Sequence, residues 1–129
     1  MNFRSKFEAN FSKSILTNNT QYEKHKLPYQ VPASNHTYTP DFKITGTNIF
    51  LELKGRFDLA DRKKHILLKQ QYPQYRIIIV FMQPKQTLSK ASKTTYAEWC
   101  NKNNIEWMTA SDALSLISTC ALGHNSSTQ

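Results

Sequence analysis

Apolar and polar residues alternate along the chain in segments with helical spacing and segments with strand spacing. In the first segment the apolar residues recur every four positions, at Phe3, Phe7, Phe11 and Ile15. Ser5 and Glu8 fit a capping box at the start of this repeat, so we expect a helix over about residues 5–17. The next segment contains prolines at Pro28, Pro32 and Pro40. Proline excludes a helix there and predicts an extended chain, with strand pairing over residues 22–27.

A hairpin and a second helix are predicted next. Alternating apolar and polar residues predict strands over residues 39–44 and 48–54, joined by a tight glycine turn. An aspartate, Asp58 or Asp61, can cap a helix that turns its apolar residues inward and ends before Pro73.

Two further strand–helix units complete the pattern. The run over residues 75–82 is apolar on both faces, as expected for a central strand. Thr95 and Glu98 form a second capping box, which predicts a helix there, and residues 103–108 fit a turn and a short strand. Ser111 is expected to cap the last helix. This order predicts an α/β fold, a mixed β-sheet with parallel crossovers that is flanked by helices.

Composition bounds the organisation and the partners of the chain. Its 129 residues suit one domain, expected over residues 1–122, with a flexible polar tail at 123–129. The formal charge of +8 and pI near 9.6 favour a polyanionic partner, either nucleic acid or an anionic membrane surface. The longest apolar run has six residues, against roughly 20 for a membrane span, and no amphipathic stretch carries the lysine-rich polar face of a surface-binding helix, so no membrane association is expected. Two cysteines without a CxxC pair, and no apolar leader, indicate a reducing cytoplasm.

The register of the predicted hairpin places its acidic residues together. A two-residue turn at residues 46–47 opposes Lys43 to Phe50 and Asp41 to Glu52. Because side chains alternate between the faces of a strand pair, one face is apolar and comprises Phe42, Ile44, Ile49, Leu51 and Leu53. The other face carries Asp41, Glu52 and Lys54.

The polar face of this hairpin suits a divalent cation. Carboxylates directly opposed on two strands repel each other, so a cation between them is expected. With a backbone carbonyl they form an oxygen-rich site that suits Mg²⁺ or Mn²⁺, and such an ion can activate water and neutralise a phosphate. Lys54 can orient or activate that water, so Pro-Asp, ten residues, then Glu-x-Lys predicts a metal-dependent phosphodiester hydrolase. The alternative is a surface hairpin in which Glu52 and Lys54 form an ion pair of little energy.

A longer run of residues around the hairpin resembles a known family. The segment VPASNHTYTPDF, residues 31–42, is preceded by LPY and followed by IFLELKG and DRKKHILL. In order and spacing these segments resemble phage endonuclease I, the Holliday-junction resolvases of short-tailed coliphages, and the similarity runs from FRSKFE to YAEWCNKNNIEW. The resemblance implies a domain-swapped homodimer with a restriction-endonuclease-like core that cuts four-way and branched DNA. The helix and strand of residues 5–27 would be exchanged between subunits through a bridge at residues 28–36.

The resemblance also implies roles for individual residues. Asp41, Glu52 and Lys54 match the catalytic carboxylates and lysine, with Mg²⁺ as cofactor and Mn²⁺ able to substitute. The backbone carbonyl of Leu53 matches a metal ligand, although a smaller polar residue is expected at this position in the family. Glu8 matches a further glutamate, which reaches the opposite subunit's site and can hold a second metal; a capping role also explains it. The sequence ends without the basic C-terminal extension expected of the family.

Basic residues near the hairpin and on the first helix are candidates for DNA contacts. We expect phosphate contacts from Arg4, Lys6, Arg56, Arg62, Lys63, Lys64 and His65. For the residues of the second helix, a solvated helix face is an equal alternative. A loop after residue 82 carries three lysines, and its composition suits either a flexible rim or a DNA clamp. His36 can hold its own loop by hydrogen bonding or contact a phosphate.

The sequence therefore predicts a metal-dependent endodeoxyribonuclease that acts on branched DNA in the cytoplasm, that of the host if a phage encodes it. Two alternatives stay open. One is a less selective nuclease with the same core that nicks mismatched or linear duplex DNA. The other is a basic DNA-binding protein whose carboxylates are structural. Metal dependence separates enzyme from binder, and a comparison of a four-way junction with a linear duplex separates the two nucleases.

Overall fold

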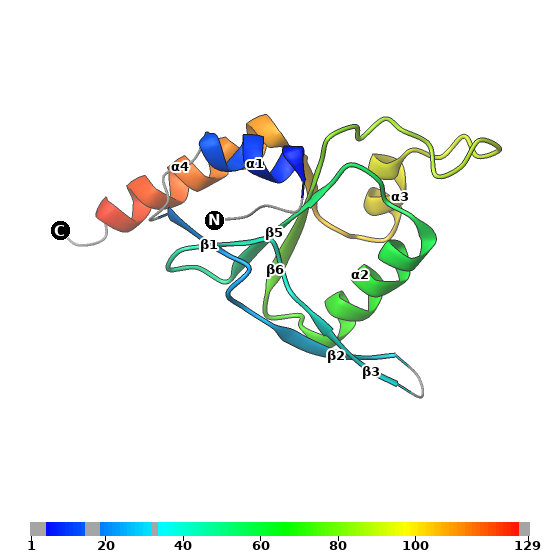
Figure 1. Cartoon of the computed structure of the whole chain (residues 1–129), viewed down its shortest axis with the longest axis horizontal. Helices are drawn as coiled ribbons and strands as arrows, with labels where there is room; N and C mark the ends of the chain where they lie inside the picture. The colour runs from blue at the N-terminus through cyan, green and yellow to red at the C-terminus, as the bar shows by residue number, and fades with distance from the viewer. Residues whose placement is uncertain (1–4, 15–18, 32–33, 127–129) are drawn as a thin grey trace.

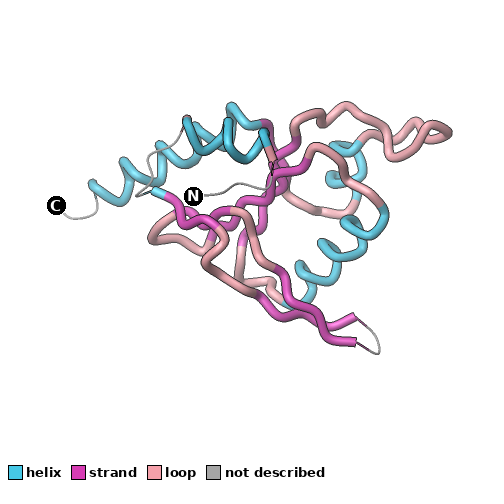
Figure 2. Tube along the Cα trace, viewed as in Figure 1, coloured by secondary structure: helices cyan, strands magenta, loops and turns pink. Residues whose placement is uncertain are grey.

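The computed structural model describes residues 5–14, 19–31 and 34–126, in which helices pack on a twisted sheet (Figure 1). The main sheet has five strands in the order β1-β4-β5-β6-β7: β1 (Thr20–Tyr22), β4 (Phe42–Ile44), β5 (Ile49–Lys54), β6 (Arg76–Phe81) and β7 (Trp107–Thr109). A separate two-stranded sheet consists of β2 (Leu27–Val31) and β3 (Ser34–Tyr38). The helices are α1 (Lys6–Lys13), α2 (Leu59–Gln71), α3 (Tyr96–Lys102) and α4 (Ala110–Ser126). Figure 2 shows the same trace by secondary structure, with the β2–β3 hairpin projecting from the body.

The main sheet is mixed, as predicted. β1 pairs antiparallel with β4, and β4 pairs antiparallel with β5. β5 pairs parallel with β6, and β6 pairs parallel with β7. The crossovers between the parallel strands contain α2 and α3. Each of these helices begins with a capping box, at Asp58 for α2 and at Thr95 for α3. The predicted capping box at Thr95 is therefore confirmed, and of the two candidate caps of α2 the structure has Asp58 at the N-cap. No helix in the described ranges is both long and apolar enough to cross a membrane.

Helices cover both faces of the main sheet. Helices α1 and α4 lie together on one side, and α2 and α3 lie on the other (Figure 1). Phe11 of α1 and Ile117 of α4 pack in one cluster with Leu51 of β5. On the other side, Leu68 of α2 packs with Phe50, also of β5. The alternation of β5 side chains between two apolar layers explains why this strand is buried along almost its whole length.

The hairpin that carries the acidic residues has the predicted register. Lys43 pairs with Phe50 and Phe42 pairs with Leu51 across a turn in which Gly46 has a φ of 76°. A positive φ is readily adopted by glycine, which explains its place in the turn. The apolar face is confirmed, because its five members are buried in one cluster: Phe42, Ile44, Ile49, Leu51 and Leu53.

An aromatic cluster fixes the chain just after β5. Phe57 is 1% exposed, and its ring centroid lies 5.2 Å from that of Phe81 and 5.3 Å from that of Trp99. Tyr96 of α3 joins the same cluster at 5.9 Å from Phe57. Edge-to-face aromatic pairs of this kind add stability beyond the area they bury. The segment between β5 and α2 is thereby held against the sheet.

The structure differs from the sequence prediction in three local respects. Strand pairing was expected over residues 22–27, but β1 ends at Tyr22 and β2 begins at Leu27; β2 pairs with β3 as a hairpin whose Leu27 and Tyr29 pack in the same cluster as Leu68 of α2. The predicted cap of the last helix was wrong, because α4 begins at Ala110 and the hydroxyl of Thr109 accepts the amide hydrogen of Asp112 at 3.2 Å. Helix α4 also continues to Ser126, into the predicted tail, while the end of the predicted first helix lies outside the described residues.

Candidate active site

The polar side chains of the hairpin line one cleft at the end of β5. Asp41, Glu52 and Lys54 line this cleft, which has a volume of about 650 Å³, and Glu8 of α1 lines it from the other side. The sequence prediction that the first three share a face is therefore confirmed. Strand β5 brings Glu52 and Lys54 together, because they are two residues apart and so point to the same side.

Asp41 is held in place by the neighbouring strand. Its carboxylate is 1% exposed, and Oδ2 accepts the backbone amide hydrogen of Leu53 at 2.9 Å. The described backbone pairing of β4 with β5 ends at Phe42 and Leu51. Beyond that pair, the side chain of Asp41 takes the place of a backbone acceptor for the amide of Leu53. The predicted proximity of Asp41 and Glu52 arises through this side-chain contact with the strand that bears Glu52.

Glu52 is a buried carboxylate under electrostatic strain. The residue is 5% exposed, and burial together with the nearby negative charge of Asp41 raises its pKa from 4.5 to about 7. Lys54, 3.6 Å away, and the hydroxyl of Tyr38, which donates to Oε1 at 2.8 Å, lower the pKa and offset part of this effect. A divalent cation bound here would favour the ionised form of Glu52.

Lys54 is positioned by two carboxylates. Its ammonium group lies 2.9 Å from Oδ1 of Asp61 and 3.6 Å from Oε2 of Glu52. Burial lowers the pKa of Lys54, but the charges of Glu52 and Asp61 outweigh burial and the pKa is raised, so the amine stays protonated. Asp61 also completes the capping box of α2. From the sequence Asp61 was expected only as a cap, because its spacing of seven residues from Lys54 is no signal of a contact between them.

A second group of carboxylates shares Asp41. Ligand oxygens of Glu8, Glu23 and Asp41 lie within 4.8 Å of one another. Glu8 also accepts hydrogen bonds from the hydroxyl of Tyr22 at 2.8 Å and from that of Ser5 at 3.3 Å. Glu23 follows β1 with a φ of 48°, and its amide donates to the carbonyl of Asp41 at 3.0 Å. Glu23 was not predicted as a site residue, because no local pattern in the sequence distinguishes it from a surface glutamate.

The donor set fits a hard divalent cation. Carboxylate oxygens dominate it, as Mg²⁺ and Mn²⁺ prefer. The carbonyl of Lys54 accepts from the amide of Met82 in the β6 direction. Because successive carbonyls of a strand point to opposite sides, the carbonyl of Leu53 faces the β4 side, where its own amide meets Asp41. Asp41, Glu52 and the Leu53 carbonyl can therefore act on one ion, and Glu8 with Glu23 can extend the site.

The predicted DNA-contact residues fall into three groups. Lys6 and Lys64 line the cleft, and the Lys64 ammonium lies 5.5 Å from the ring centroid of Tyr38. Arg56, two residues after β5, and Lys63 of α2 are exposed, whereas Arg62 is half-buried and donates to the carbonyl of Phe57 at 2.8 Å. Arg4 lies outside the described residues.

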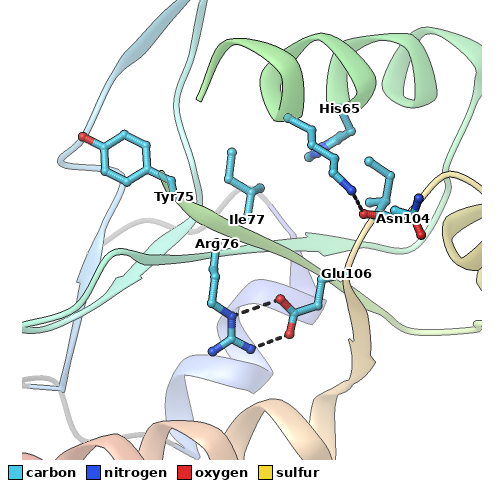
Figure 3. A pocket seen from close by; sticks show the side chains of 8 residues that line it. His65, Tyr75, Arg76, Ile77, Asn104 and Glu106 are labelled. Carbon is cyan, nitrogen blue, oxygen red and sulfur yellow. Dashed lines mark hydrogen bonds and ion pairs between the residues drawn. The ribbon is translucent and has the colours of Figure 1, made fainter. Parts of the chain in front are cut away.

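His65 lies inside the protein rather than on the predicted DNA-contact surface. It is 2% exposed, and burial, with the positive charges of Lys64 and Lys54, lowers its pKa to about 3, so the ring is neutral. It lines a separate cavity of about 190 Å³ next to the Arg76–Glu106 ion pair (Figure 3). A phosphate contact by His65 does not fit this placement. His36 is exposed and hydrogen-bonded to the hydroxyl of Ser34 at 3.0 Å.

Comparison with known proteins gives consistent matches over most of the chain. Residues 1–117 match the family described as phage endonuclease I. Endonuclease I of Escherichia phage T7 is 45% identical over 107 residues, covering 81% of this chain and 71% of that protein. Endodeoxyribonuclease 1 of Enterobacteria phage T3 is 43% identical over 105 residues, covering 80% of this chain and 68% of that protein.

Proposed function

The chain belongs to the phage endonuclease I family, and on that premise we propose that it is a dimeric, metal-dependent endodeoxyribonuclease that resolves four-way junctions and other branched DNA. The observation that carries the proposal is the convergence of Asp41, Glu52 and Lys54 in one cleft at the end of β5. Two carboxylates and an ammonium group at one place supply the charges that hydrolysis of a phosphodiester needs.

Mg²⁺, with Mn²⁺ able to substitute, is the cofactor of the proposed reaction. Asp41, Glu52 and the carbonyl of Leu53 would hold it, and Glu8 with Glu23 would hold a second ion. When bound, such a cation supplies an acidic water and neutralises negative charge on the scissile phosphate. The raised pKa of Glu52 supports this assignment, because burial and the nearby charge of Asp41 both disfavour the ionised carboxylate, and a bound cation would offset these two effects.

The side chains around the carboxylates orient the reactive groups. Lys54 stays protonated between Asp61 and Glu52, so its role in this proposal is to orient the attacking water and stabilise charge that develops on the phosphate. Tyr38 fixes one oxygen of Glu52 by a hydrogen bond and leaves the other facing Lys54. Lys6 and Lys64 line the cleft with positive charge suited to the DNA backbone.

A two-fold dimer suits a four-way junction, because two equivalent sites can cut two symmetry-related strands. In the single chain, α1 and β1 pack on the chain's own sheet, where Phe11 joins the core and Tyr22 pairs with Phe42. An exchange of α1 and β1 between two copies would keep these contacts and replace the β2–β3 hairpin with a straight connection. The helix-covered mixed sheet, with Glu52 on β5 and Asp41 directly before β4, supports a restriction-endonuclease-like core.

The test is cleavage of a synthetic four-way junction beside a linear duplex of the same arm sequence, with Mg²⁺ or with EDTA. We expect cutting of the junction in Mg²⁺ alone. Lys54→Ala should slow it on the order of a hundredfold or more, as for loss of one preorganised electrostatic group. Lys102→Ala, which alters an exposed lysine at the end of α3, is the matched control. Cutting in EDTA, or an undiminished Lys54→Ala variant, would refute the mechanism. Equal cutting of duplex and junction would favour the less selective nuclease, and binding without cutting would favour the DNA-binding protein.

A further inference from the structure

A projecting segment between β6 and α3 carries a concentration of unopposed positive charge. We refer to residues 83–95 as the basic arm; it contains Lys85, Lys90 and Lys93 and no aspartate or glutamate. All three lysines are exposed, and no ion pair in the described part of the chain engages them. Figure 1 shows the basic arm extending past α3, away from the body of the protein.

The basic arm has a defined backbone structure. Its two limbs bond to each other, with the amide of Leu88 donating to the carbonyl of Thr94 at 2.9 Å and the amide of Tyr96 donating to that of Gln86 at 2.8 Å. Leu88 packs against the aromatic cluster around Phe57. These contacts anchor the root of the arm and leave the lysines outside, which favours the clamp over the flexible rim considered from the sequence.

The basic arm begins beside the candidate active site. Lys54 and Phe81 are partners in the parallel β5–β6 pair, and the amide of Met82 donates to the carbonyl of Lys54 at 3.0 Å. Met82 itself lines the cleft and is 52% exposed. DNA bound in the cleft would therefore pass the root of the arm.

We propose that the basic arm is a phosphate-tracking surface that holds one duplex arm of the DNA substrate next to the cut strand. This inference rests on the proposed function. Beyond the Leu88–Thr94 hydrogen bond the arm has five residues, 89–93, which double back and can extend about 8 Å further, since each limb has two to three residues of roughly 3.3 Å. That distance spans about two phosphates of one strand, because each strand advances roughly 3.4 Å per nucleotide. Lysines on such an arm contact phosphates without reading bases, as a structure-selective enzyme requires.

The test compares two doubly substituted variants with equal loss of charge. Lys90→Gln/Lys93→Gln alters the basic arm. Lys69→Gln/Lys102→Gln is the control, because both exposed lysines lie at the ends of helices that lead into β6 and β7, at the opposite end of the sheet from Lys54. Binding of a labelled four-way junction is measured by fluorescence anisotropy in EDTA over a series of salt concentrations. Thermal melting checks that each variant is folded.

We expect the arm variant to lose affinity and salt dependence together. Each phosphate contact contributes about 0.9 to the slope of log affinity against log salt, so the slope should fall by about 1.8. At about 0.1 M salt each such contact is worth roughly eightfold, so affinity should fall by tens of fold, with little change in the control. In Mg²⁺, the loss should appear mainly in the enzyme concentration that gives half-maximal cleavage. Wild-type affinity and slope in the arm variant, or an equal loss in the control, would overturn the inference. A wild-type protein that binds no DNA would instead refute the proposed function.

Discussion

Replacement of Glu52 by glutamine tests whether the candidate site is held at a cost in stability. The carboxylate is buried close to Asp41, which raises its pKa from 4.5 to about 7. Glutamine has nearly the same shape and can still accept the hydrogen bond from Tyr38. The variant therefore removes the buried charge and leaves the packing of β5 in place.

The magnitude follows from the pKa of Glu52 in the folded and unfolded states. Below pH 4.5 the group is protonated in both states; between 4.5 and about 7 only the unfolded state loses the proton, so stability falls as pH rises. At about 1.4 kcal/mol per pKa unit, the whole interval corresponds to a loss of about 3 kcal/mol, complete above pH 7. Glu52→Gln should lack this loss and should be the more stable protein by about that amount above pH 7.

The assay is urea unfolding of wild type and variant in EDTA, followed by circular dichroism across this pH range. The difference between the two free energies of unfolding should grow from pH 4.5 to about 7 and then stay constant. Glu106→Gln is the matched control, since that carboxylate is 40% exposed and pairs with Arg76 at the surface. A pH-independent difference for Glu52→Gln, or a lower stability above pH 7, would refute the reasoning. The variant should also lose cleavage activity.

Two other substitutions test the supports of the site. Asp61→Asn should slow cleavage about tenfold, because Lys54 loses its nearest carboxylate. The free energy of unfolding should change by less than about 1 kcal/mol, since Asp58 still caps α2 and asparagine can still accept the amide hydrogen of Asp58. Wild-type cleavage rates, compared with an Asp112→Asn control, would contradict this role. Phe57→Ala should reduce the free energy of unfolding by about 3–5 kcal/mol in urea titrations, because a ring that is 1% exposed leaves a cavity among other aromatic side chains; a loss below about 1 kcal/mol would show that the cluster does not anchor the chain.

Local signals in the sequence were sufficient for the helices, the central strands and the polar face of the hairpin. The capping box at Thr95, the aspartate caps available before α2 and the turn at Gly46 fix backbone geometry within a few residues, so they predicted the starts of α2 and α3 and the register of the hairpin. The predicted cap of α4 was wrong, because Thr109 and Ser111 are both residue types that cap helices well. Thr109 takes this role because β7 ends there, which the local sequence does not indicate.

Features that depend on distant segments could not be predicted from local patterns. The β2–β3 hairpin forms because Leu27 and Tyr29 pack against Leu68 of α2. The prolines of this stretch predict only an extended chain and give no sign of that contact. His65 follows three charged residues and was expected at the surface, but the helix turns it inward. Glu23 enters the site only through the backbone contact of β1 with Asp41. Contacts between distant segments determine the hairpin and the positions of His65 and Glu23, and local secondary-structure propensity does not.

Anomalous diffraction from crystals of the protein grown in Mn²⁺ tests whether Asp41, Glu52 and the carbonyl of Leu53 hold a divalent cation. We expect a manganese peak between Asp41 and Glu52, about 2.1 Å from an oxygen of each carboxylate and from the carbonyl oxygen of Leu53. Carboxylates that point apart with no peak between them, or manganese bound only elsewhere on the protein, would contradict it.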